Sequence, residues 1–306
     1  MRRLSLAAGV LTFVVVVVGA YVRLSDAGLG CPDWPLCYGK PIPDAGEDAR
    51  AWKEMGHRYL AGVLGILIFA LALVAWRTRR SPWLATAIAG LVVFQATLGK
   101  WTVTLLLKPA IVVAHLAGGM TLLGLLTWLA LVQYRGGARM PNAHALRVPA
   151  LVALLAVGIQ ILLGGWVSAN TAALACPDLP LCLGQALPPM DFANAFHVLR
   201  ELGRTDAGEL LPQAALVAIH WSHRIFALLV VAAVAWAATR AFQVSRRLGT
   251  AIALLLVIQF SLGVANVAFN LPLALAAAHN AGAAGLLTAL VVLNFFAFRD
   301  HTSSSP

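Results

Sequence analysis

Eight long apolar runs limit this chain to one kind of fold. A helix of about 20 apolar residues crosses the hydrocarbon core of a bilayer, where every backbone polar group has to be bonded within the segment. Hydrophobic residues make up 60% of the 306 positions and charged residues only 11%. We therefore predict an all-α polytopic membrane protein. Its eight transmembrane helices are predicted at about residues 6–24, 57–76, 84–103, 110–132, 148–167, 214–238, 248–269 and 273–298.

The first apolar run follows Met1-Arg2-Arg3, so it also has the form of a cleavable signal peptide. The fifth run ends in a closely related sequence, which favours a first run that is retained as a helix.

Basic residues gather in alternate connections between the runs. With the N-terminus in the cytoplasm, 12 of the 22 Lys and Arg residues fall inside, together with a single acid, Asp300. This asymmetry follows the positive-inside rule, so both termini are predicted to be cytoplasmic and both cysteine-containing loops external. The net charge of +10 belongs to the cytoplasmic connections and implies no nucleic-acid partner.

Motifs of the first half of the chain return in the second half at offsets of 145 to 166 residues, with a 21-residue insertion in the second external loop. Each half holds four runs, so both halves enter the membrane in the same direction. We predict two tandem, parallel-repeat four-helix bundles, residues 1–140 and 141–306, divided at a basic segment with Gly136, Gly137 and Pro141. The matched residues are Cys31/Cys176, His57/His223, Gln95/Gln259 and His115/His279.

Four histidines lie at matched positions near the external ends of the second, fourth, sixth and eighth runs. Ionisable residues inside a membrane span usually belong to a functional site. Histidines on facing helices of a bundle can clamp a haem, since imidazole is a good axial ligand for iron. The alternative is that each histidine forms a hydrogen bond between helices. The predicted metal ligands are His57 with His115 and His223 with His279, with space left by Gly56, Gly118, Gly119, Gly282 and Gly285.

Charged residues accompany the first histidine of each half. Arg58 and Arg224 directly follow a histidine and could pair with haem propionates, or could be ordinary interfacial anchors. Glu54 occupies the position that His220 takes in the second half, which suggests a division of labour between the halves.

The four cysteines form two C-x5-C pairs, Cys31/Cys37 and Cys176/Cys182. This spacing fits neither the usual zinc pattern nor the redox C-x-x-C pattern. Disulfides persist on the external side of a bacterial inner membrane. We favour structural disulfides that hold a loop over the haem mouth, and a redox-active pair is the alternative.

Together these motifs resemble the haem A synthase family over essentially all eight runs. The residues that carry the resemblance are Val22-Arg23-Leu24-Ser25-Asp26-Ala27-Gly28-Leu29-Gly30-Cys31-Pro32-Asp33-Trp34-Pro35, Glu54-x-x-His57-Arg58, Gln95-x-x-Leu98-Gly99-x-x-Thr102-Val103 and the four matched histidines.

The resemblance implies an enzyme of the bacterial inner membrane that oxidises a porphyrin methyl of haem o to a formyl, giving haem a for cytochrome oxidase. It implies haem o as substrate in the first half, haem b as cofactor in the second half, and Glu54 as the catalytic residue. It further implies supply by a haem O synthase, contact with membrane lipid and an electron donor or acceptor that it does not identify; self-association stays open. The implied site residues are His57, His115 and Arg58 for the substrate and His223, His279 and Arg224 for the cofactor.

Two other functions fit parts of the sequence. A dihaem, quinol-linked electron-transfer protein of the membrane would need the four histidines but not Glu54. A thiol–disulfide oxidoreductase would use the cysteine loops and no haem.

Overall fold

The computed structural model describes residues 1–44, 46, 48–133 and 143–299, and these residues form helices and loops with isolated β-bridges but no strand. Eight of the helices are long and apolar enough to cross a membrane, which confirms the predicted all-α class. They are α1 (Arg2–Leu24), α2 (Ala49–Thr78), α3 (Pro82–Thr104), α4 (Pro109–Val132), α5 (Arg147–Ala169), α7 (Gln213–Val244), α8 (Arg246–Ala268) and α9 (Leu273–Phe298). Short helical turns are η1 (Ala143–Leu146), η2 (Ala172–Leu174) and α6 (Phe192–Ala195).

Helix ends follow local chemistry. Pro82 and Pro109 occupy the first turns of α3 and α4, where the missing N–H costs nothing. Asp48 caps α2 by accepting a hydrogen bond from the backbone N–H of Arg50. Helix α2 therefore begins well before the predicted start near His57, and Glu54 lies inside it.

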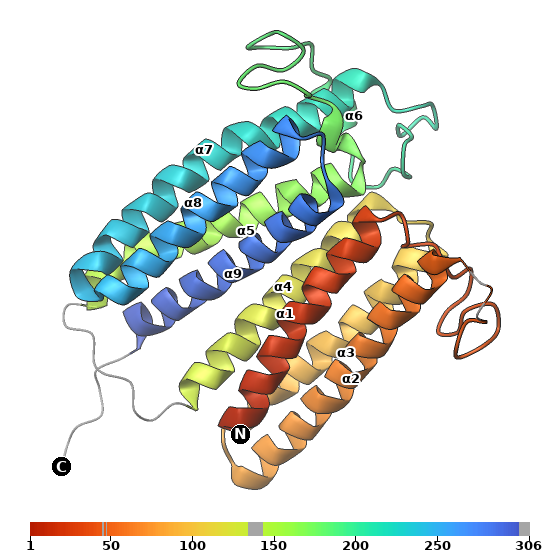
Figure 1. The fold of residues 1–306 in the computed structure, drawn as a ribbon. Helices are drawn as coiled ribbons and strands as arrows, with labels where there is room; N and C mark the ends of the chain where they lie inside the picture. Colours follow the sequence, from red (N-terminus) through yellow and green to blue (C-terminus); the bar gives the residue numbers. More distant parts are fainter. Residues whose placement is uncertain (45, 47, 134–142, 300–306) are drawn as a thin grey trace.

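The helices pack as two groups of four (Figure 1). Helices α1 to α4 contact one another in a ring, as do α5, α7, α8 and α9, and the two groups meet where α1 and α4 face α5 and α9. Around each ring, α2 stands opposite α4, and α7 stands opposite α9. The predicted boundary segment with Gly136, Gly137 and Pro141 lies outside the described residues, as does Asp300.

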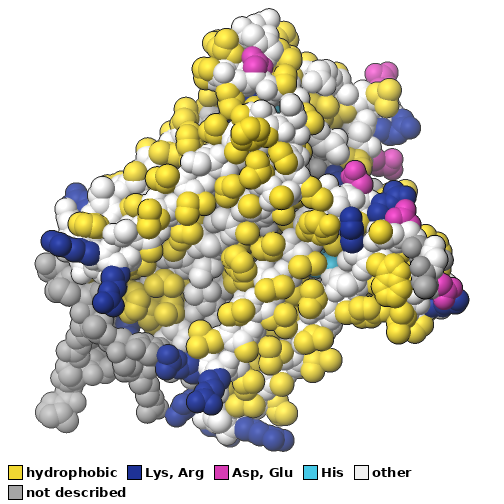
Figure 2. All heavy atoms as spheres, viewed as in Figure 1, with side chains coloured by type: hydrophobic (Ala, Val, Ile, Leu, Met, Phe, Trp, Pro, Cys, Tyr) yellow, Lys and Arg dark blue, Asp and Glu magenta, His cyan; other side chains and the backbone are white. Residues whose placement is uncertain are grey.

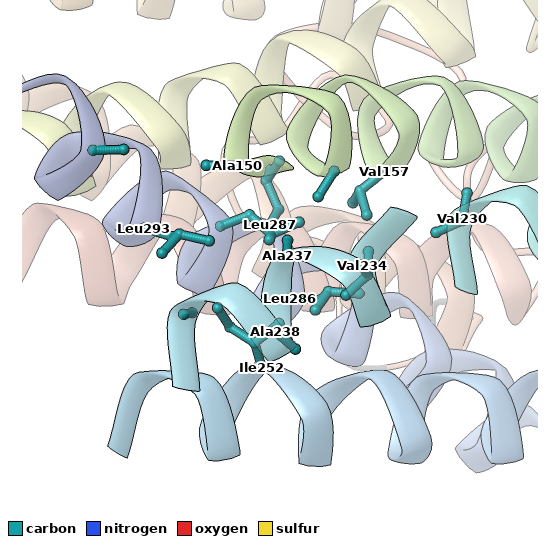
Figure 3. Packing of buried hydrophobic residues seen from close by; sticks show 14 of the residues in the cluster. Ala150, Val157, Val230, Val234, Ala237, Ala238, Ile252, Leu286, Leu287 and Leu293 are labelled. Atoms are coloured by element: carbon teal, nitrogen blue, oxygen red, sulfur yellow. The ribbon is translucent and has the colours of Figure 1, made fainter. Parts of the chain in front are cut away.

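Small and branched side chains fill the interior of the second group (Figure 3). Ala150 of α5, Val234 of α7, Ile252 of α8 and Leu293 of α9 are all fully buried in one cluster. Asn294 adds an interhelical hydrogen bond, from Nδ2 to the carbonyl of Ala150 at 2.8 Å. Close packing and such bonds hold helices together in lipid, where no hydrophobic driving force separates protein from solvent.

Large apolar side chains also cover the outside of the helices. Ile66, Leu155 and Val257 are each more than half exposed, as lipid-facing residues would be. Figure 2 shows a broad hydrophobic band between two charged ends, with Lys and Arg gathered near the N-terminus and Asp and Glu near the loops at the opposite end. We call this opposite end, where both cysteine loops lie, the loop end.

Candidate functional site

Each group of helices carries a disulfide loop at its loop end. The structure joins Cys31 to Cys37 and Cys176 to Cys182. All four cysteines are fully buried, with 0% exposure. A thiol on a partner protein cannot reach sulfur atoms in this position, which favours a structural role over redox exchange.

An aspartate braces each loop from within. Asp178 accepts hydrogen bonds from the backbone N–H groups of Leu183 at 2.7 Å and Gly184 at 2.8 Å. Asp33 accepts the corresponding pair in the first loop, at 2.7 and 2.9 Å. The bond from Gly184, followed by the bond from Leu183, holds the pKa of Asp178 below its ordinary value.

Arg58 ties α2 to the first loop. Its Nη1 donates to the carbonyls of Asp33 at 3.0 Å and Leu36 at 2.7 Å, and its Nη2 donates to Oε1 of Glu54 at 2.5 Å. The pairing of this guanidinium with a haem propionate stays a prediction, and its terminal nitrogens bind the loop backbone and Glu54.

Arg224 does the same for the second loop. Its Nη2 donates to the carbonyl of Cys176 at 2.5 Å, and its Nη1 donates to the carbonyls of Asp178 and Leu181 at 2.9 and 3.0 Å. Its Nε lies 3.2 Å from Nε2 of His220. Both arginines thus bind the backbone of their disulfide loop.

Glu54 is buried, with 4% exposure, at the centre of the first of these contacts. Its Oε2 accepts a hydrogen bond from the backbone N–H of Cys31 at 2.8 Å, while Oε1 pairs with Arg58. The residue lies one helical turn before His57 on the same face of α2, nearer the loop end. His220 is buried in the same place relative to His223.

The predicted histidine pairs each lie within one group of four helices, on helices that stand opposite each other. His57 on α2 and His115 on α4 come from opposite helices of the first group and lie within electrostatic range of each other. His223 on α7 and His279 on α9 do the same in the second group.

Each imidazole rests against a glycine of a neighbouring helix. A Cβ on that glycine would come within 2.8 to 3.4 Å of the ring carbon Cε1 in all four cases. The contacts are Gly19 with His57, Gly99 with His115, Gly164 with His223 and Gly263 with His279. The glycines predicted to make room lie elsewhere: Gly118 and Gly282 accommodate the side chains of Gln95 and Gln259, Gly119 faces Val16, Gly285 faces Leu255, and Gly56 has no neighbour within 4 Å.

The chemistry of these residues fits a haem at each pair. In the described part of the chain, the Nδ1 atoms of His57, His115, His223 and His279 are buried without a hydrogen-bond partner. A buried polar atom left in this way costs free energy unless something binds beside it. The described residues contain no group of three or more His, Cys, Asp or Glu suited to a metal ion, and a haem iron needs only axial ligands from the protein.

Comparison with known proteins decides the family. The chain matches the cytochrome oxidase assembly protein family (COX15-CtaA) over residues 2–291. It belongs to this family. A protein of Shewanella oneidensis named Heme A synthase is 40% identical, over 97% of this chain and 96% of the relative. Proteins with the same name from Caulobacter vibrioides and Halalkalibacterium halodurans are each 30% identical, over 94% and 69% of this chain and 92% and 72% of their own lengths.

Membership of the cytochrome oxidase assembly protein family confirms the predicted resemblance and agrees with an integral membrane protein. Within this family member, sequence reasoning missed Gln160 of α5. Its Nε2 donates to the backbone carbonyl of His223 at 3.1 Å and lies 3.4 Å from Nε2 of the same histidine. The signal was present, because Gln160 is a polar residue inside an apolar run and its first-half counterpart is Val15.

Sequence reasoning also missed a residue of the second external loop. Arg200 lies in the stretch of the second external loop that has no first-half counterpart, and it is only 2% exposed. An arginine in a polar loop carries no sign of burial in the sequence, so tertiary structure alone reveals it.

Proposed function

We propose that this chain is a haem A synthase, an enzyme that oxidises a porphyrin methyl of haem o to a formyl and so supplies haem a for cytochrome oxidase. The observation that carries the proposal is that each group of helices holds two histidines on opposite helices, His57 with His115 and His223 with His279. Relatives that match almost the whole chain are named Heme A synthase, which supports the same reaction here.

The two halves take different haems in this proposal. Residues 1–140 bind the substrate, haem o, through His57 and His115, and residues 141–306 bind haem b through His223 and His279. When bound, haem b supplies one-electron chemistry. The halves form a parallel repeat, and the exchange of Glu54 for His220 at matched positions supports the division between substrate and cofactor.

Glu54 is the proposed catalytic residue. A carboxylate one turn from His57 can take up and release a proton near the rim of a porphyrin, or can stabilise positive charge there. Its bonds to Cys31 and Arg58 fix the carboxylate in position before substrate arrives. Arg58 and Arg224 hold the two disulfide loops across the loop end, where they would limit the access of water.

The protein is proposed to lie in the bacterial inner membrane with both termini cytoplasmic and the loop end in the periplasm. The Lys and Arg side chains gathered at the end opposite the loops support this orientation (Figure 2). A haem O synthase would supply the substrate through the shared bilayer, and a redox partner would accept electrons. Lipid surrounds the helices, and self-association is compatible with this arrangement.

Identification of the bound pigment tests the proposal. The full-length protein is purified from its membrane, and the extracted haems are identified by mass. Haem o, haem a or a hydroxylated intermediate beside haem b is the expected result. Haem b alone would favour the dihaem electron-transfer protein. A protein without haem would favour the thiol–disulfide oxidoreductase, which the complete burial of the cysteines already disfavours.

A further inference from the structure

Arg200 is a buried cation without a counter-ion. Its residue exposure is 2%, and the described residues place no carboxylate within ion-pair distance of it. Only Nη1 has a hydrogen bond, a long one of 3.4 Å to the carbonyl of Arg204, whereas Nε and Nη2 are buried with no partner. An arginine side chain stays charged in proteins, and a buried charge is costly unless it is paired. These free donors therefore point to an anionic ligand.

The loop around Arg200 is built to hold it in place. The guanidinium lies over the ring of Trp166, 5.6 Å from the ring centroid. The indole Nε1 of Trp166 donates to the carbonyl of Ala195 at 2.9 Å, and the backbone N–H of Asp191 donates to the carbonyl of Ala214 at 3.1 Å. The stretch that carries Arg200 is thus fastened both to the last turns of α5 and to the start of α7.

Arg200 packs against Trp166 in the loop-end turns of α5, and the same helix touches the His223 ring through Gly164. Trp166 and Ile219 belong to one buried cluster. Ile219 precedes His223 by one turn on the same face of α7, and Trp166 follows Gly164, which touches the His223 ring, by two residues. Trp166, which lies under Arg200, is therefore about 3 Å nearer the loop end of α5 than the glycine that touches the His223 ring.

The other arginine near this pair, Arg224, already binds the loop backbone and His220. Arg224 uses Nη1, Nη2 and Nε on loop carbonyls and on His220. Arg200 has two N–H donors of one guanidinium to spare, Nε and Nη2, and this edge of the group is the one that binds a carboxylate with two parallel hydrogen bonds.

We propose that Arg200 binds a propionate carboxylate of the haem held by His223 and His279. This inference rests on the proposed function, since it assumes a haem at that pair. In this proposal the inserted stretch of the second external loop gives residues 141–306, the half that binds the cofactor, a cation that the first half lacks. The carboxylate would satisfy Nε and Nη2 together and neutralise the buried charge.

The test compares two porphyrins that differ only at the carboxylates. Full-length protein is purified from haem-depleted cells and reconstituted with haem b or with haem b dimethyl ester, and transfer of each to excess apomyoglobin gives its dissociation rate. For the unaltered protein we expect haem b to leave at least about 10-fold more slowly than the ester, as charge-assisted bonds predict. Arg200→Met should release haem b about 10-fold faster and the ester at an unchanged rate, so that the preference disappears.

Arg204→Met is the matched control, because Arg204 belongs to the same loop but is exposed. It should keep the preference. Arg200→Lys covers the case in which the methionine variant does not fold: it keeps the charge but not the two parallel donors, so part of the preference should remain. Equal rates for haem b and ester in the unaltered protein would overturn the proposal, and so would an intact preference in Arg200→Met. A loss of co-purifying phospholipid in that variant without a change in preference would assign Arg200 to a lipid phosphate instead.

The proposed function fails separately. If His223→Ala and His279→Ala each keep the haem b spectrum, the ligation itself is wrong, whatever Arg200 does. If those variants lose the spectrum while Arg200→Met keeps the carboxylate preference, only the role of Arg200 is wrong.

Discussion

Glu54 and Arg58 form an ion pair of 2.5 Å one turn apart on α2, and the second oxygen of Glu54 holds the backbone N–H of Cys31. The same carboxylate therefore belongs both to the proposed chemistry and to the anchoring of the first disulfide loop. A substitution that keeps the anchoring and removes the charge separates the two roles.

Glu54→Gln is that substitution, because an amide oxygen still accepts a hydrogen bond from Cys31. We expect a folded protein that keeps its second-half haem, with conversion reduced on the order of 10²-fold, as for loss of a proton-transfer group. The measurement is the ratio of haem o, hydroxylated haem and haem a extracted from cells. His220→Gln, at the matched position, should leave the ratio nearly normal. An unchanged ratio in Glu54→Gln would reduce Glu54 to a loop anchor.

Replacement of His223 or His279 by Ala should remove the low-spin haem b absorbance of the purified protein, because each supplies one axial ligand in the proposed arrangement. His57→Ala and His115→Ala should keep that absorbance and lose bound substrate. His144 is exposed at the start of the second half, so His144→Ala serves as a control for handling of the protein. Retention of the spectrum in both second-half variants would rule out this ligation.

The double substitution Cys176→Ser with Cys182→Ser tests the role of the second disulfide. Closing a short loop restricts the unfolded chain, so its loss should lower the free energy of unfolding by roughly 2–3 kcal/mol. Conversion per folded molecule should stay close to normal, because the sulfur atoms are buried away from any exchange partner. A well-folded variant with no conversion would instead indicate redox chemistry at these cysteines.

The second loop should also open in acid. The backbone bonds from Gly184 and Leu183 lower the pKa of Asp178 from 3.8, so this carboxylate stabilises the closed loop above its unfolded pKa, and that contribution is lost as pH falls through the folded value. Reduction of the Cys176–Cys182 disulfide by a phosphine should accelerate below pH 3.8. Asp178→Asn should show fast reduction without this acid step. A pH-independent rate in the unaltered protein would contradict the assignment.

Gln160 should keep the His223 ring in one orientation. The backbone carbonyl of His223 only accepts hydrogen bonds, so the amide group facing it is the NH2, which also lies 3.4 Å from Nε2 of the His223 ring. Gln160→Leu removes both contacts at similar volume, and we expect a broadened low-spin electron paramagnetic resonance signal from the second haem. Ile159→Leu, on the exposed side of α5, is the control. An equally sharp signal in both variants would deny Gln160 this role.

The sequence was sufficient for features written in local patterns. The length of the apolar runs predicts the eight spans. The matched offsets predict which histidines pair, because few histidines occur inside the apolar runs. The start of α2 was placed too late, since Arg50, Lys53 and Glu54 give a stretch that is polar in sequence yet helical through the Asp48 cap and contacts with the first loop. The division into a tandem repeat stays a prediction.

Other parts of the site depend on three-dimensional contacts that cannot be predicted from the residue types alone. From the sequence, Arg58 and Arg224 could equally bind a ligand, anchor the helix at the membrane interface or bind a loop. Only the folded structure shows that loop carbonyl groups accept hydrogen bonds from them. The glycines beside the rings lie on α1, α3, α5 and α8, whereas all five predicted glycines lie on the helices that carry the histidines themselves or their partners, α2, α4 and α9.

The contact between each histidine and its glycine restricts which substitutions can accumulate during evolution. Gly164 and His223 lie on different helices, yet a side chain on Gly164 would meet the ring at 3.0 Å, so Gly164 cannot gain a side chain unless the His223 ring moves or is lost. A descendant that loses the haem of one half is freed from both constraints at once. Its histidines and their glycines should then drift together in that half alone, while the other half keeps all four residues.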